Sequence, residues 1–180
     1  SPVTAADIVN TWPERKLASL FGNYGEERYS GRIARAIVAR RAQSPLTRTA
    51  ELVDTIKGAI PTPARFGAGN PARRVFQALR IEVNDELNSL RRALPEAFEL
   101  LEPGGVMAVI SFHSLEDRMV KEFFAGKARA CTCPPEFPVC VCGGKATGEV
   151  MTPKAVTPGM RELEANPRSS SAKLRALRRL

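Results

Sequence analysis

The residues best suited to chemistry lie together in the stretch 111–118, which reads SFHSLEDR. His113 is the only histidine among the 180 residues, and a neutral imidazole can accept or donate a proton near pH 7. Ser111 and Ser114 place hydroxyl groups on either side of it. We therefore take His113 and Ser111 as candidate catalytic residues and Ser114 as a candidate substrate contact. In the alternative interpretation, Ser114 only caps a helix whose first turn is acidic.

A second set of candidates is a polar stripe at helical spacing, formed by Arg73, Gln77, Arg80, Asn84 and Arg91. Arginine binds phosphate through paired hydrogen bonds, and asparagine can contact base edges. The alternative is a solvated helix face whose arginines pair with nearby acidic residues, and Arg118 also suits an ion pair. The candidate residues for contacts to a substrate or nucleic acid are Asn70, Arg73, Arg80, Asn84, Ser114 and Arg118.

The four cysteines form one cluster with the spacing C-x-C-x6-C-x-C, at Cys131, Cys133, Cys140 and Cys142. Four thiolates can hold zinc tetrahedrally, but C-x-C is tighter than the usual C-x2-C knuckle. Free thiols or a labile redox pair are the alternatives in a reducing compartment. We therefore expect no metal, with zinc at these cysteines as the weaker interpretation. The sequence also shows no Gly-rich phosphate loop that could hold a nucleotide-like cofactor.

Composition and charge narrow the class of protein. Lysine and arginine number 27 against 19 aspartate and glutamate, a net charge of +8, and hydrophobic residues make up 43%. This content supports a packed core, and the excess positive charge favours a polyanionic partner. No apolar run approaches the roughly 20 residues that cross a bilayer, and the start does not resemble a signal peptide. We expect neither an integral membrane protein nor a secreted one.

The elements that would position these residues begin with short helices, expected at 5–10, 13–21, 26–41 and 49–60. A Pro/Gly-rich linker then leads to Asn70, which can cap the longest helix, with Pro71 at its first helical position. The apolar seam of that helix continues at helical spacing to Leu94. Pro95 is expected to mark a break or a restart.

The elements around His113 follow a Gly-Gly turn. Residues 106–112 form an apolar run typical of a buried strand, and a helix through residue 124 follows. An uninterrupted apolar run fits a sheet covered on both faces, so we predict an interior strand of a mainly parallel sheet. His113 would then face a cleft at the carboxyl end of that strand, where open α/β sheets bind their ligands. Further on, we expect an edge strand at 148–157 and a short helix at 158–165, whereas 171–180 fits either a helix or a strand.

Two long motifs make the chain comparable to a known family. Residues 69–87 read GNPARRVFQALRIEVNDEL, and residues 103–121 read PGGVMAVISFHSLEDRMVK. Both are similar to signature segments of the bacterial 16S rRNA cytosine-N4 methyltransferases, also called MraW. The start at 4–10, the Cys-Pro-rich loop and the ending at 164–175 match as well, so the resemblance covers essentially the whole chain.

The resemblance implies an α/β fold that is part of a class I S-adenosylmethionine-dependent methyltransferase, with a Rossmann-like sheet and an inserted all-helical lobe. Residues 1–70 would form the inserted substrate-recognition lobe. Residues 71–180 would form the C-terminal part of the methyltransferase domain, with a Cys-rich loop at 131–142 and the tail as a final antiparallel strand. Members of the family carry a further segment before this start. We expect the S-adenosylmethionine site in that missing part and no cofactor-binding residue in this chain.

The resemblance also implies the function, which is N4-methylation of a cytidine in the decoding region of 16S rRNA. The expected partners are this RNA and the small ribosomal subunit, the expected location is the cytoplasm without a membrane, and a homodimer stays open. We expect the chain by itself, as a fragment, to be an inactive transferase. The alternative from another class is a non-catalytic RNA-binding module that uses the helical lobe and the arginine stripe.

Overall fold

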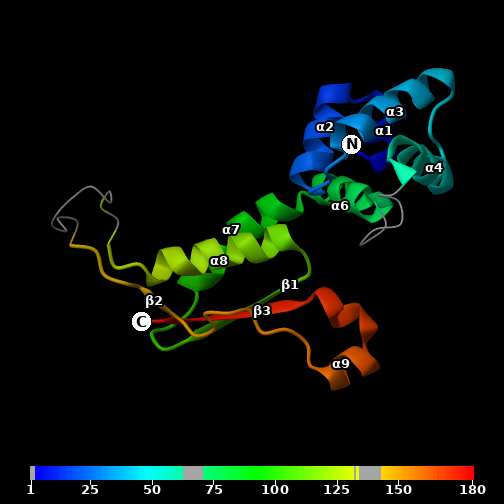
Figure 1. Cartoon of the computed structure of the whole chain (residues 1–180). Helices are drawn as coiled ribbons and strands as arrows, with labels where there is room; N and C mark the ends of the chain where they lie inside the picture. Colours follow the sequence, from blue (N-terminus) through cyan, green and yellow to red (C-terminus); the bar gives the residue numbers. More distant parts are fainter. Residues whose placement is uncertain (1–2, 63–70, 132, 134–142) are drawn as a thin grey trace. The chain divides into compact units, whose positions relative to one another are not determined.

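The computed structural model describes residues 3–62, 71–131, 133 and 143–180, and Figure 1 traces their path. The chain divides into two compact units, Ser1–Glu86 and Leu87–Leu180. Helices form the first unit, and the second combines helices with a small sheet. None of the helices in the described part of the chain is both long enough and apolar enough to cross a membrane.

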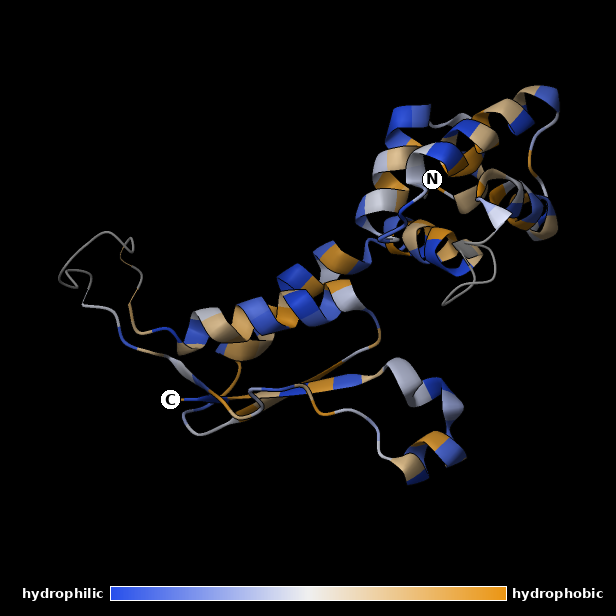
Figure 2. Ribbon diagram, viewed as in Figure 1, coloured by the Kyte–Doolittle hydropathy of each residue, from blue (hydrophilic) through white to orange (hydrophobic). Residues whose placement is uncertain are grey.

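The first unit is built from helices around one hydrophobic core. Each helix carries both hydrophilic and hydrophobic residues, as the hydropathy colouring of Figure 2 shows. Their apolar sides meet in a core that contains the fully buried Phe21, Ile37 and Ile56. The helices are α1 (Ala5–Thr11), α2 (Glu14–Asn23), α3 (Ser30–Gln43), α4 (Thr49–Ala59) and α6 (Pro71–Val83).

A local signal explains where the first of these helices begins. The Thr4 hydroxyl accepts the backbone N–H of Asp7 at 3.1 Å, and the Asp7 carboxylate accepts the Thr4 N–H at 2.9 Å. This reciprocal capping box starts α1 where the sequence predicts it. The prediction for α3 is wrong by one turn, because that helix starts at Ser30. Glu26 has a left-handed backbone with φ of 48°, which a right-handed helix does not include.

Helix α6 is part of the first unit because its apolar face is buried there. Ala72, Val75, Ala78 and Leu79 lie in the same core as the helices before it, and α6 packs against α1, α2 and α4. The compact unit therefore extends past residue 70 to Glu86. Its role in substrate recognition stays a prediction.

The helix predicted as the longest is in fact two helices. Helix α6 ends at Val83, and α7 runs over Glu86–Glu99 with Pro95 inside it rather than at a break. Between them Asp85 has φ of 50°, a conformation that aspartate tolerates better than most residues. The apolar seam is continuous in the sequence, but its halves serve different cores. Val83 packs against the first core, whereas Leu94 is buried in the second.

The second unit packs α7 and α8 against a three-stranded antiparallel sheet with the strand order β1-β3-β2. The tail pairs as an antiparallel strand, as the resemblance implies, with Ser111 opposite Lys173. The edge strand expected at 148–157 consists of β2 and one bridge between Val156 and Leu174. After α7 the elements are β1 (Val106–Ser111), α8 (Ser114–Ala128), β2 (Gly148–Val150), α9 (Met160–Ala165), a 3-10 helix (Pro167–Ser171) and β3 (Lys173–Arg179).

Within the described residues, β1 is not the interior strand of a parallel sheet that the apolar run predicts. It lies at the edge of the sheet and pairs antiparallel with β3. Met107 and Val109 pack on the second core, whereas Val106 and Ile110 on the other face are 47% and 57% exposed. The apolar run thus continues onto a face that no described element covers.

Candidate functional site

The candidate site is the turn between β1 and α8, where the structure places His113 at the N-cap of the helix. His113 Nδ1 accepts the backbone N–H of Glu116 at 3.3 Å. In return, one carboxylate oxygen of Glu116 accepts the backbone N–H groups of Phe112 at 2.9 Å and of His113 at 3.2 Å. This is a capping box in which a histidine takes the place usually held by serine or threonine. The prediction that Ser114 caps α8 is therefore wrong, since Ser114 is the first helical residue.

The capping box determines which nitrogen of a neutral His113 carries the proton. Because Nδ1 accepts a hydrogen bond, a neutral His113 carries its proton on Nε2. Nε2 lies 3.4 Å from Glu116 Oε1, and only 6% of the His113 side chain is exposed. The imidazole is thus held in one orientation beside a carboxylate, and its role as a catalytic residue stays a prediction.

Ser111, the second catalytic candidate, is buried at the end of β1. Its hydroxyl donates a hydrogen bond to the backbone carbonyl of Lys173 at 3.4 Å, so it extends the pairing between β1 and β3. Phe112 follows it with a side chain that is 54% exposed. The Ser111 hydroxyl is therefore hydrogen-bonded to the neighbouring strand, and a catalytic role for it stays a prediction.

One charged cluster near the turn is absent from the candidates that the sequence supplied. Asp117 in the first turn of α8 is 8% exposed and accepts two hydrogen bonds from Arg175, at 2.6 and 3.1 Å. Lys173 adds a third at 3.3 Å. The Arg175 guanidinium, assisted by Lys173, lowers the pKa of the Asp117 carboxyl below its ordinary 3.8 despite the opposing effect of burial. The alternation of Lys173, Leu174 and Arg175 puts both cations on one face of a strand, which is the signal that could have predicted this cluster.

The polar stripe is divided between the two compact units. Arg73 is exposed on α6, and Arg80 donates two hydrogen bonds to the Glu86 carboxylate, at 2.8 and 3.0 Å. Asn84 donates to the same carboxylate at 3.1 Å. Arg91 lies in the second unit, where it donates to the side-chain oxygen of Asn88 at 2.6 Å.

The remaining candidates are Arg118, Asn70 and the cysteine cluster. Arg118 is exposed on α8, and Asn70 lies outside the described residues. Of the cysteines, Cys133 donates its backbone N–H to the sulfur of Cys131 at 3.4 Å, while Cys140 and Cys142 also lie outside the described residues. The zinc interpretation therefore stays untested.

The described residues of this turn do not fit the methyl donor S-adenosylmethionine that the resemblance implies. A strand-to-helix turn binds an anionic or polar ligand through backbone N–H groups that point away from the helix. Here the N–H groups of Phe112 and His113 bond to the Glu116 carboxylate, the N–H of Glu116 bonds to His113, and the N–H of Asp117 bonds to the carbonyl of His113. These four backbone N–H groups of the turn are thus already bonded within it.

Comparison with known proteins shows a similarity along the entire chain. The family model described as the MraW methylase family matches residues 1–180. A protein of Heliobacterium modesticaldum named Ribosomal RNA small subunit methyltransferase H is 56% identical over 180 residues, which is 100% of this chain and 58% of the relative. Proteins with the same name from Carboxydothermus hydrogenoformans and Geobacter sulfurreducens are each 54% identical, over 100% and 99% of this chain and 58% of each relative. The chain therefore spans a little under three fifths of the length of these curated relatives.

Proposed function

The chain belongs to the MraW methylase family, and on that basis we propose that it takes part in N4-methylation of a cytidine in the decoding region of 16S rRNA. The observation that supports the proposal is the match of the family over all 180 residues, together with relatives named as methyltransferases of small-subunit ribosomal RNA. Methyl transfer in this reaction uses S-adenosylmethionine as the donor. A net charge of +8 is compatible with an RNA substrate.

We place the donor site in the part of the longer relatives that these residues do not cover. Support comes from the turn before α8, where the backbone N–H groups of Phe112, His113 and Glu116 are already bonded within the turn. The exposed face and edge of β1 support a larger sheet of the class I, Rossmann-like kind. Val106, Ile110 and Phe112 present a mostly apolar surface there, which further strands and helices would bury.

Within this chain, His113 is the residue that we propose for proton transfer. Methylation of an exocyclic amine requires that one proton leave the nitrogen, and an imidazole can accept it near neutral pH. In the capped arrangement Nε2 carries a proton and Nδ1 holds the lone pair, so accepting the proton requires that Nδ1 release the Glu116 backbone N–H. Ser111 is the weaker candidate, since its hydroxyl bonds to Lys173.

For RNA binding we propose the first unit as the substrate-recognition lobe, with Arg73 as its leading contact in the stripe. Arg73 is exposed, and no hydrogen bond or ion pair of its side chain to another described residue is found. Arg80, in contrast, would have to exchange its paired bonds to Glu86 for bonds to phosphate. We therefore expect Arg73 to contribute more than Arg80 to RNA affinity and to its salt dependence.

A chimaeric enzyme tests the proposed function. In the Heliobacterium modesticaldum relative, the span that matches this chain would be replaced by these 180 residues. We expect the chimaera to transfer a methyl group from S-adenosylmethionine to small ribosomal subunits that lack the modification. Nuclease digestion and mass spectrometry would locate the methyl group on N4 of one cytidine of 16S rRNA.

Two results would contradict the proposal. One is a folded chimaera that modifies another nucleotide. The other is a folded chimaera that binds the subunit and the donor but transfers no methyl group, which would favour the non-catalytic RNA-binding alternative. The unmodified relative, assayed in parallel, serves as the matched control.

A further inference from the structure

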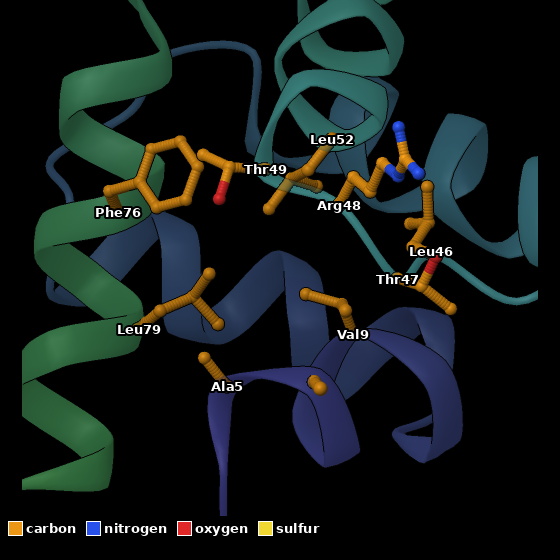
Figure 3. Close-up of a pocket in the computed structure, with 10 residues that line it drawn as sticks. Ala5, Val9, Leu46, Thr47, Arg48, Thr49, Leu52, Phe76 and Leu79 are labelled. Atoms are coloured by element: carbon orange, nitrogen blue, oxygen red, sulfur yellow. The ribbon is translucent and has the colours of Figure 1, made fainter.

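A cavity in the first unit plays no part in the function proposed above. It has a volume of about 130 Å³ and lies between α1, α4, α6 and the segment that leads into α4. Figure 3 shows the side chains around it. Most of its walls are apolar and come from Ala5, Val9, Leu46, Leu52, Phe76 and Leu79. We call it the lobe cavity.

The size and one wall of the lobe cavity favour a single aromatic ring. An apolar cavity of about 150 Å³ in another protein accepts benzene, so about 130 Å³ suits one six-membered ring and is small for a fused purine. The ring of Phe76 forms part of one wall. Aromatic side chains are the usual stacking partners of bases that have left a nucleic-acid helix.

Polar groups at the cavity match the edge of a pyrimidine. Thr47 and Thr49 both line the cavity, and Figure 3 draws their side chains among those around it. A hydroxyl can donate to a ring carbonyl or accept from an exocyclic amine. A mostly apolar cavity with a few hydroxyls at its rim therefore suits a planar base better than an aliphatic side chain.

The charge at the mouth suits a phosphate group. Arg48 lines the mouth and is exposed, and Figure 3 shows its guanidinium group directed away from the cavity. Glu51 is the acidic residue next to it. Its carboxylate accepts the backbone N–H groups of Thr47 at 2.9 Å and Arg48 at 3.0 Å and lies 3.6 Å from Arg40, so its charge is compensated. The first unit as a whole carries 13 basic and 9 acidic residues.

From these observations we propose that the lobe cavity binds an unstacked pyrimidine base of single-stranded RNA, with Arg48 at the adjoining phosphate. The inference rests on the proposed RNA substrate and adds a binding point on residues other than those of the turn before α8. The cavity would bind one nucleotide of the substrate through base stacking and through a volume that fits one ring, rather than through a full set of hydrogen bonds.

Binding of short RNAs to the 180-residue chain tests the inference. The probes are ten-nucleotide oligouridine, oligoadenosine and an abasic ribose-phosphate oligomer, each labelled for fluorescence anisotropy. We expect oligouridine to bind about tenfold more tightly than the other two. Ala5→Leu, which fills the cavity, and Thr49→Val, which removes the hydroxyl at nearly constant shape, should abolish that preference without changing affinity for the abasic oligomer. Ala42→Leu, at an exposed alanine of α3 outside the cavity, is the matched control and should leave the preference intact.

A second measurement separates failure of the cavity from failure of the proposed function. Uridine alone, titrated into the isotope-labelled chain, should shift the backbone amide resonances of Val9, Thr49 and Leu79, and these shifts should disappear in Ala5→Leu. If all three oligomers bind equally tightly and uridine causes no shifts, base binding in the lobe cavity is overturned. The proposed RNA binding by the first unit would then still stand. Shifts with uridine in a chain that binds none of the oligomers would support the cavity and count against the RNA-binding lobe. A chain that binds none of the oligomers and shows no shifts with uridine would overturn both the cavity proposal and the proposed RNA-binding lobe.

Discussion

At the scale of single residues, His113 combines a structural role in capping α8 with a proposed role in proton transfer. Its Nδ1 starts α8 by accepting the Glu116 backbone N–H, and its Nε2 faces the Glu116 carboxylate. A substitution therefore has two effects, one on the stability of the helix and one on any proton transfer. Different replacements can measure them independently.

We expect His113→Ala to lower the free energy of unfolding by about 1 kcal/mol, because it removes the cap of α8. His113→Asn should restore most of this loss, since the asparagine oxygen can accept the same N–H. Urea denaturation of the chain measures both values. In the chimaeric enzyme, turnover should fall sharply in both variants. Full turnover of a stable His113→Asn enzyme would remove His113 as the proton acceptor.

The buried carboxylate of Asp117 makes stability depend on pH in a defined direction. Because Arg175 lowers the folded-state pKa of Asp117 below its ordinary 3.8, the stabilisation is complete above that value and is lost as the pH falls through the lowered pKa. We expect Asp117→Asn to cost about 2 kcal/mol at neutral pH. Urea denaturation at pH values from about 7 down to 3 should show this difference shrinking toward the acid end.

Glu122→Gln is the matched control for the Asp117 experiment, because it removes an exposed carboxylate from the same helix. Its effect should be small at every pH. A cost of Asp117→Asn that stayed constant down to the lowest pH would mean that the ion pair with Arg175 is not its source.

At the scale of elements, the turn between α2 and α3 shows how closely the segments of the first unit approach one another. Gly25 in this turn is buried, and a Cβ atom added there would lie 2.6 Å from the backbone oxygen of Arg74 in α6. The same atom would lie 2.7 Å from the backbone oxygen of Phe21 in α2. Neither oxygen can move without shifting a helix, so the close approach depends on glycine.

We expect Gly25→Ala to lower the free energy of unfolding by about 2–3 kcal/mol through this overpacking. Gly31→Ala in α3 is the matched control. A Cβ at that position meets no atom within 4 Å, and alanine favours a helix over glycine by about 0.8–1 kcal/mol, so this variant should be more stable. Thermal denaturation of the two variants checks the opposite signs. Equal effects would show that α6 and the turn are not in contact.

At the scale of the whole molecule, the described residues form a helical unit and a sheet unit whose outer strand β1 has an exposed apolar face. The relatives are longer than the span that this chain matches. A donor site in that additional part, as we propose, would leave these 180 residues unable to hold the donor.

We therefore expect the 180-residue chain to show no saturable binding of S-adenosylmethionine in the micromolar range. The physical reason is that the backbone N–H groups of Phe112, His113 and Glu116, in the turn before α8, are bonded within that turn. Isothermal titration calorimetry of the chain tests this expectation, with the chimaeric enzyme as the positive control. Saturable micromolar binding would place the donor site on residues of this chain that the sequence did not indicate.

The sequence by itself determined the features that depend on neighbours three or four residues apart. The capping box of Thr4 and Asp7, the apolar run of β1 and the start of α6 after the linker all follow from such local patterns. The motifs at 69–87 and 103–121 were sufficient to indicate the family, which the match over the whole chain confirms. For the tail, local pattern left helix and strand open, and the strand followed only from the resemblance.

Tertiary structure decided what depends on contacts between distant segments. One continuous apolar seam became α6 and α7 because its two halves are buried in two cores, and no local signal in the sequence distinguishes them. The partner of Asp117 is Arg175, far along the chain. The position of β1 at a sheet edge likewise depends on which strands are present beside it. Burial and pairing of this kind are properties of the packed chain, because they arise only when segments distant in sequence exclude water together.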